Sequence, residues 1–205
     1  GVNIARTGLT EAQAKEAGFD AVSVVTVVDD KAHYYPGASS FVVKMIADRT
    51  SLKLLGLQVI GTGAVDKMAD IAVMAITMGA DLHDVEDLDL AYAPPFSTAI
   101  HPFTHTVNVL LNKISGAFET FTPAEYLDGA AEGYRVVDLS LQPAIEGAPF
   151  VDLTSITDKM EGFDDREEKL LLVCTKGKRA YMAQNRLKHC GYTHTRVLEG
   201  GTTVN

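Results

Sequence analysis

The stretch L-L-L-V-C-T-K-G-K-R, residues 170–179, decides the fold of the C-terminal part of the chain. Its apolar start predicts a short strand buried on both faces, and residues 181–189 predict a helix that ends at Gly191. A strand, a tight loop and a helix in immediate succession are typical of a parallel sheet covered by helices. We therefore expect an α/β domain with further short strands at residues 134–139, 150–153 and 196–198.

The loop between this strand and helix makes Cys174 the leading candidate for a catalytic nucleophile. Backbone N–H groups and the positive end of the helix dipole should converge on its sulfur. Lys176, Lys178 and Arg179 add three cations within five residues, which favours thiolate over thiol, and Gly177 lets the loop curl tightly. The alternative is a free cysteine that only fills space at the end of a core strand. Three cations and a glycine in one loop favour the functional interpretation.

The length of the loop bears on its ligand. Four residues, 175–178, separate Cys174 from Arg179. This is one residue fewer than in phosphate-binding cysteine loops, so the smaller cradle suits a persulfide sulfur better than a phosphate. A phosphatase is the weaker interpretation.

The motifs C-T-K-G-K-R (174–179), V-V-D-L (136–139) and L-E-G-G (198–201) together resemble a rhodanese domain. The resemblance implies that Cys174 accepts a sulfane sulfur and carries it as a persulfide. It also implies that Thr175, Lys176, Gly177 and Lys178 form the cradle and that Arg179 completes it.

Two departures from the rhodanese pattern affect the segments that are expected to form the wall of a pocket around Cys174. The Asp-x-Arg that usually ends the first strand is Asp138-Leu139-Ser140, and a shorter segment, residues 145–150, precedes the second strand. They motivate an alternative in which the domain is a catalytically silent docking or dimer-stabilising module.

The N-terminal part of the chain has a different pattern. Three β-rich runs at residues 21–30, 41–48 and 52–61 have connections too short for a crossover helix, which predicts a three-stranded antiparallel sheet. Helices are expected at 66–78 and from about 106 to 118, giving an α+β domain. The first of these helices is apolar almost all round, so we expect a second copy of the chain to cover part of it, in a homodimer.

Ordered motifs in this part resemble the dimerisation domain of the pyridine nucleotide-disulfide oxidoreductases, and within them the coenzyme A-disulfide reductases that carry a fused rhodanese domain. These motifs are T-G-L-T-E (7–11), F-V-V-K-M-I-A-D-R-T (41–50), L-L-G-L-Q-V-I-G-T-G-A-V-D-K (54–67) and Y-A-P-P-F-S (92–97). The resemblance implies a dimerisation domain at 1–122 and a rhodanese-like domain at 134–205, and the Pro, Gly and acidic residues between them predict a linker at 123–133. It also implies that Tyr92, and Tyr34 or Tyr35, reach the partner's redox site, against the alternative of aromatic packing at an interface.

The same resemblance implies FAD, NAD(P)H and possibly coenzyme A in a longer enzyme that reduces disulfides or persulfides. Polysulfide, thiosulfate, and coenzyme A persulfide or disulfide are the expected small-molecule partners. We expect the N-terminal FAD- and NAD(P)-binding domains to be missing from this chain, which opens at Gly1 without an initiator Met. The run Gly61-Thr62-Gly63 is not a dinucleotide fingerprint, because Asp66 stands where a third glycine or alanine is needed.

Composition excludes several other classes. The chain has 205 residues, with 27 acidic against 18 basic side chains and a net charge of −9, which argues against nucleic-acid binding. It has no apolar run of the ~18 residues that a membrane span needs. Two cysteines are too few for a disulfide scaffold and fit a reducing cytoplasm. Cys190 is expected to be structural, and His101 and His105 to be loop histidines rather than metal ligands.

Overall fold

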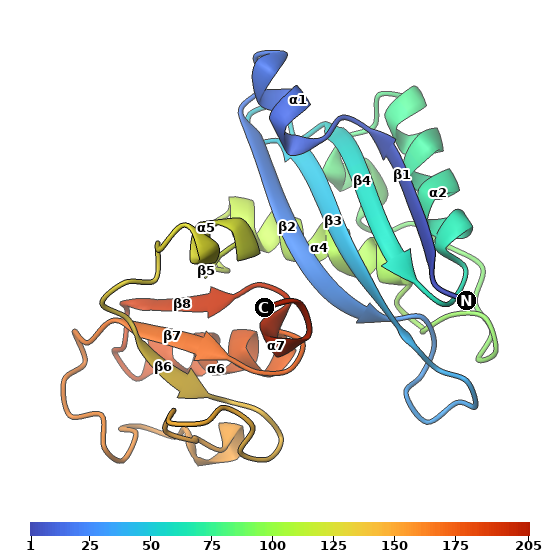
Figure 1. Cartoon of the computed structure of the whole chain (residues 1–205). Coiled ribbons are helices and arrows are strands. Elements are labelled where there is room, and N and C mark those ends of the chain that lie inside the picture. The colour runs from blue at the N-terminus through green and yellow to red at the C-terminus, as the bar shows by residue number, and fades with distance from the viewer. The chain divides into compact units, whose positions relative to one another are not determined.

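The computed structural model describes all residues from Gly1 to Asn205 and divides them into two compact units, Gly1–Ser115 and Gly116–Asn205. Each unit has its own sheet and helices (Figure 1). The longest helices have 13 residues, and none combines the length and the apolar character that crossing a membrane requires.

The first unit is built on a four-stranded antiparallel sheet with the strand order β1-β4-β3-β2. Its strands are β1 (Asn3–Gly8), β2 (Ala21–Asp29), β3 (Ser40–Asp48) and β4 (Leu54–Gly61). The predicted antiparallel meander is confirmed by β2, β3 and β4, which are neighbours in the order of the sequence. The core of the unit lies on β3, where Val43, Met45, Ile46 and Ala47 are all fully buried.

The prediction of three strands was wrong by one, because β1 also belongs to the sheet. It pairs antiparallel with β4 and lies at the edge. Its side chains are exposed or half-buried, and Ile4 is 77% exposed. Backbone hydrogen bonds rather than a buried apolar face hold this strand, so its sequence lacks the alternation by which a half-buried strand is recognised.

The helices of the first unit are α1 (Glu11–Glu16), α2 (Val65–Thr77), α3 (Leu82–Val85) and α4 (Pro102–Ile114). A reciprocal capping box of Thr10 and Gln13 starts α1. The α2 helix packs on β4 and β1, and α4 packs on β2 and β3. The predicted α+β arrangement is therefore confirmed.

The α4 helix begins four residues earlier than predicted. Pro102 is its first residue and not a break, because the first N–H groups of a helix need no partner within it. His101 provides the N-cap, and its Nδ1 accepts a hydrogen bond from the Phe103 amide at 3.2 Å. The helix ends at Ile114, before the predicted end at Phe118.

The apolar α2 helix has one covered and one open face within a single chain. Five of its residues are buried: Val65, Met68, Ala69, Ala72 and Ala75. On the other side, Val73, Met74 and Met78, the last at the C-cap, are 40%, 61% and 76% exposed. Exposed apolar side chains that gather on one helix are typical of an interaction surface.

The second unit has a parallel sheet with the strand order β5-β8-β7-β6, so the predicted parallel sheet is confirmed. The strands are β5 (Thr120–Phe121), β6 (Arg135–Asp138), β7 (Leu170–Val173) and β8 (Thr195–Leu198). The helices are α5 (Pro123–Leu127), the 3-10 helix η1 (Leu153–Ser155), α6 (Lys178–His189) and α7 (Gly201–Val204). All four residues of β7 are buried, as its apolar run predicts.

The prediction of a strand at residues 150–153 was wrong. Only Phe150 pairs with the sheet, through an isolated parallel bridge to Asp138. The chain then turns into η1, because the Asp152 carboxylate accepts the amide and the hydroxyl of Thr154, both at 2.7 Å. A side chain that satisfies the local backbone in this way competes with strand formation.

The junction between the two units differs from the expected linker at 123–133. The strand β5 precedes that segment and pairs with β8 of the second sheet. The α5 helix lies within it and starts at a reciprocal capping box of Thr122 and Glu125. A two-residue strand carries no hydrophobic period, so the sequence pattern does not reveal that the second unit begins at Gly116.

Candidate functional site

The Cys174 sulfur lies directly after β7, at the N-terminal end of α6. The Gly177 amide donates a hydrogen bond to Sγ at 3.2 Å. Gly177 is the N-cap of α6 and has a φ of 89°, a left-handed conformation that favours glycine. Cys174 is 3% exposed. The loop therefore holds the thiol group against a backbone donor in a nearly closed position.

The first turn of α6 supplies positive potential near this sulfur. Lys178 and Arg179 are the first two residues of a 12-residue helix, so their amides have no acceptor within it. These N–H groups and the helix dipole favour negative charge at the helix start. The predicted loop residues Thr175, Lys176, Gly177, Lys178 and Arg179 thus follow Cys174 directly. The first three form the bend, and the last two begin α6.

Arg179 links this loop to the end of β6. Its Nε donates a hydrogen bond to the carbonyl oxygen of Leu139 at 2.8 Å, directly after β6. The pKa of the Asp152 carboxyl is lowered first by hydrogen bonds from Thr154 and then by the charge of Arg179. The guanidinium therefore binds the segment after β6 by a hydrogen bond and acts on Asp152 through its charge.

Asp138 organises the loop after β6, where the sequence departs from the rhodanese pattern. Its buried carboxylate accepts amide hydrogen bonds from Ser140 at 2.9 Å, Ala144 at 2.7 Å and Ile145 at 3.0 Å. Burial acts to raise the pKa of this carboxyl, but the amide bonds outweigh it, so the pKa is lowered. Sequence reasoning missed this role, which the Asp-Leu-Ser motif does not indicate.

Gly201 allows the C-terminal segment to lie against the cysteine loop. A Cβ atom at this position would lie 1.9 Å from the carbonyl oxygen of Cys174 and 2.7 Å from that of Thr175. Its φ is 54°. The L-E-G-G motif thus contains a glycine that the close approach of two backbones requires.

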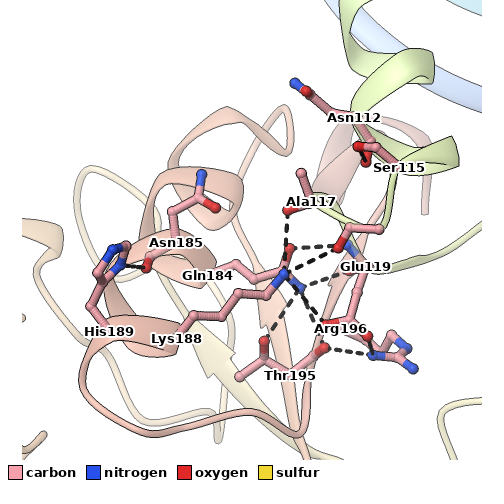
Figure 2. A network of polar contacts seen from close by, with 11 residues as sticks. Asn112, Ser115, Ala117, Glu119, Gln184, Asn185, Lys188, His189, Thr195 and Arg196 are labelled. Atoms are coloured by element: carbon pink, nitrogen blue, oxygen red, sulfur yellow. Dashed lines mark hydrogen bonds and ion pairs between the residues drawn. The ribbon is translucent and has the colours of Figure 1, made fainter.

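Gln184 connects α6 to the segment before β5 (Figure 2). This side chain is fully buried; Oε1 accepts the Glu119 amide at 3.1 Å, and Nε2 donates to the Glu119 carbonyl at 2.8 Å. The Glu119 carboxylate pairs with Arg196 at 2.7 Å and with Lys188 at 3.4 Å. The network ties α6 to the segment before β5 and to β8. Sequence reasoning missed it, because a lone glutamine on a helix carries no motif.

The candidate tyrosines belong to the other unit. Tyr34 lies in the turn between β2 and β3 and is 79% exposed, whereas Tyr35 is half-buried. Tyr92 is 55% exposed and lies in the irregular segment before α4. The phenols of Tyr34 and Tyr92 are therefore open to solvent within one chain, and Tyr34 is the more exposed member of its pair.

A pocket of about 200 Å³ lies between the two segments that carry these tyrosines. Asp30 and Lys31 line it from the β2–β3 side, and Pro95 and Phe96 line it from the Tyr92 segment. His101 also lines the pocket and is 7% exposed, so this histidine of the segment before α4 is buried.

Burial, and then the charge of Lys67, lowers the pKa of His101 to about 4. Because the unfolded chain takes up this proton near pH 6.5, stability should fall as the pH drops from 6.5 towards 4. The shift corresponds to a loss of about 3 kcal/mol. In His101→Asn, which keeps an N-cap acceptor, this component should vanish. Urea unfolding across this pH range measures it, and equal pH slopes for the two proteins would contradict the assignment.

The glycines of Gly61-Thr62-Gly63 serve packing. A Cβ atom at Gly61 would lie 2.5 Å from the Phe41 ring, and one at Gly63 would lie 2.9 Å from Asp30 Oδ2. Their strand is antiparallel to its neighbours, unlike the parallel strand of a dinucleotide-binding unit. These residues therefore do not fit a flavin or nicotinamide nucleotide.

His105 and Cys190 are not arranged as a metal ligand or as a disulfide partner of Cys174. His105 lies within α4, so the prediction of a loop position was wrong for this residue. No group of three or more His, Cys, Asp or Glu side chains is arranged to hold a metal ion. Cys190 is the C-cap of α6, whereas Cys174 lies at the helix start. Twelve residues of helix span about 18 Å, beyond disulfide reach.

Three comparisons with known proteins agree with this geometry. The NAD(P)H sulfur oxidoreductase (CoA-dependent) of Pyrococcus furiosus is 37% identical over 109 residues, which are 53% of this chain and 24% of that protein. The structure of an NAD-dependent persulfide reductase from A. fulgidus matches 98% of this chain and 37% of its own, with a TM-score of 0.88 and 32% identity. The structure of reduced Bacillus anthracis CoADR-RHD matches 99% of this chain and 37% of its own, with a TM-score of 0.88 and 28% identity.

This chain thus spans about a quarter of the curated relative's length and little more than a third of each solved chain. The family model of the pyridine nucleotide-disulphide oxidoreductase dimerisation domain matches residues 1–103, half of the chain. The match covers the antiparallel sheet, α2 and the segment that carries Tyr92. The chain belongs to the pyridine nucleotide-disulphide oxidoreductase family, through this dimerisation domain.

Proposed function

We propose that Cys174 is the sulfur carrier of a persulfide-reducing enzyme to which this chain contributes the dimerisation domain and a rhodanese-like domain. One observation carries the proposal: the Cys174 Sγ accepts the Gly177 amide at the start of α6. Helix-start amides and nearby cations suit a sulfur nucleophile that alternates between thiolate and persulfide. The likeness to a persulfide reductase along 98% of the chain supports the same assignment.

The transfer of sulfur from a donor through Cys174 to an acceptor needs no further oxidant or reductant. The Cys174 thiolate attacks the sulfane sulfur of a donor such as thiosulfate, and sulfite leaves with the electron pair of the broken S–S bond. The new Cys174 persulfide then gives its outer sulfur to an acceptor. With cyanide as acceptor, thiocyanate forms and the thiolate returns. The amides at Gly177 and the first turn of α6 stabilise the negative sulfur before and after each step.

In the whole protein we propose that the sulfur passes on to be reduced. A bound flavin, with NAD(P)H as electron source, would supply that reduction from domains outside this chain. Polysulfide and coenzyme A persulfide or disulfide are the proposed substrates. Tyr92 and Tyr34 would serve the redox site of the partner subunit, a role that their exposed phenols support. The chain alone would perform the sulfur-transfer half.

A docking module is the second candidate, favoured by one specific observation. Cys174 is 3% exposed. A domain that only docks would need no access to this sulfur.

Steady-state transfer from thiosulfate to cyanide separates the two candidates. We expect the chain to produce thiocyanate at a rate that saturates with thiosulfate. A rate equal to that of the uncatalysed mixture would support the docking module and contradict the carrier. Measuring the folded state by circular dichroism in the same samples ensures that inactivity is not unfolding.

We also propose that the exposed apolar face of α2 is covered by a second copy of the chain. Met74→Glu places a charge on this face, where Met74 is 61% exposed. Because burying an unpaired charge at an interface costs several kcal/mol, the variant should sediment as a monomer at micromolar concentration where the wild type sediments as a dimer. Leu141→Glu, at an exposed apolar position of the other unit, is the matched control and should leave the dimer intact. A monomeric wild type would contradict the proposal.

A further inference from the structure

The last residues of the chain contact the cysteine loop through its carbonyl groups. The Thr202 amide donates a hydrogen bond to the Cys174 carbonyl oxygen at 3.0 Å, and the Thr203 amide donates one to the Thr175 carbonyl oxygen at 3.0 Å. The Thr203 hydroxyl donates a second bond to the Thr175 oxygen at 2.7 Å. The short helix α7 therefore binds two consecutive carbonyls of the loop.

The direction of these carbonyls matters for the sulfur. In a planar trans peptide, the C=O and N–H groups point in opposite directions. The Cys174 carbonyl shares its peptide unit with the Thr175 N–H, and the Thr175 carbonyl shares its unit with the Lys176 N–H. Because α7 binds both oxygens, the two N–H groups point away from α7. The oxygens, which would repel a negative sulfur, are kept on the α7 side.

The contact is held in place at both of its ends. Gly200 and Gly201 have φ angles of 75° and 54°, which turn the chain sharply after β8. Asn205 Nδ2 then donates hydrogen bonds to the Glu199 carbonyl at 3.0 Å and to the Gly201 carbonyl at 2.8 Å. The glycine turn and the hydrogen bonds of Asn205 therefore hold α7 in one position against the cysteine loop.

We propose that Thr203 is a positioning residue for Cys174. Its hydroxyl and amide fix the Thr175 carbonyl on the α7 side of the loop, which orients the loop amides to favour the negative sulfur. The inference rests on the proposed role of Cys174 as sulfur carrier. Thr203 contacts the loop at the Thr175 carbonyl, so it acts through the loop and not on the substrate.

Three variants separate the hydroxyl from its surroundings. Thr203→Val removes the hydroxyl at nearly constant shape, and Thr203→Ser keeps it. Thr202→Val is the matched control, because the contact of Thr202 with Cys174 is through its amide. Two readouts are compared: single-turnover sulfur uptake from thiosulfate, and alkylation of Cys174 by iodoacetamide, each as a function of pH.

We expect Thr203→Val to slow sulfur uptake at pH 7 about fivefold, the equivalent of one hydrogen bond, and to move both pH profiles towards higher pH. Thr203→Ser should restore both, and Thr202→Val should match the wild type. Equal profiles for Thr203→Val and wild type would overturn the inference, as would a serine variant as slow as the valine variant. An equally slow Thr202→Val would also overturn it.

The proposed function and this inference fail in different ways. If wild type takes up no sulfur, the carrier assignment falls, while the alkylation profiles still test the position of the loop. If wild type takes up sulfur and Thr203→Val does so equally, only the inference falls. Thermal unfolding of each variant within a few degrees of wild type shows that the chain remains folded.

Discussion

Replacing Cys174 by serine is expected to abolish the transfer of sulfur from thiosulfate to cyanide. A hydroxyl group is a poor nucleophile near neutral pH and forms no S–S bond, so no persulfide can form. Loss of a covalent nucleophile leaves only what binding contributes, so the rate should fall by at least about 10³-fold. Thiocyanate formation by the purified variant, at saturating thiosulfate, measures the loss.

Cys190→Ser is the matched control for this substitution. Cys190 is the other free cysteine and lies at the opposite end of α6. We expect its variant to keep the wild-type rate. Equal activity of Cys174→Ser and wild type would contradict the assignment, and a loss confined to Cys190→Ser would move the carrier to that residue.

Gly201→Ala is expected to disrupt the cysteine loop and to destabilise the second unit. The new Cβ would lie 1.9 Å from the Cys174 oxygen, so one of the two backbones must move. The left-handed φ of 54° adds about 1 kcal/mol of strain. With the clash, we expect a loss of about 3 kcal/mol or more in the free energy of unfolding. Urea unfolding and the transfer rate should both report it.

Gly133→Ala separates strain from clash. Gly133 also has a left-handed φ, 80°, but a Cβ there would meet nothing within 4 Å. Its variant should lose only about 1 kcal/mol of stability and keep the transfer rate. If the two variants lost similar amounts of stability, the close approach of α7 to the loop would contribute nothing to the free energy of unfolding.

The sequence predicts the elements whose local signals and tertiary environment agree. The apolar run 170–173 becomes a fully buried parallel strand, and the capping box at Thr10 starts a helix. Prediction from the sequence fails where an element is stabilised by contacts that its own apolar pattern does not reveal. The β1 strand is held by its edge pairing, and the segment at 150–153 follows the capping side chain of Asp152 instead of its apolar residues.

The same distinction applies to the candidate site. Consecutive residues place Cys174, Gly177 and the start of α6 together, so the sequence alone predicts them as one group. Thr203, 29 residues beyond Cys174, contacts the cysteine loop only through the fold, and Gln184, 10 residues beyond Cys174, finds its partner Glu119 in the same way. Nothing in their local sequence marks them, because a glutamine or a threonine acquires its partners only when distant strands meet.

The mass of the intact chain after incubation with thiosulfate and removal of the excess tests the carrier assignment most directly. We predict a gain of one sulfur atom, located on the peptide that contains Cys174 and discharged as thiocyanate when cyanide is added. An unchanged mass in the folded chain, or a sulfur atom located on Cys190, would contradict the account.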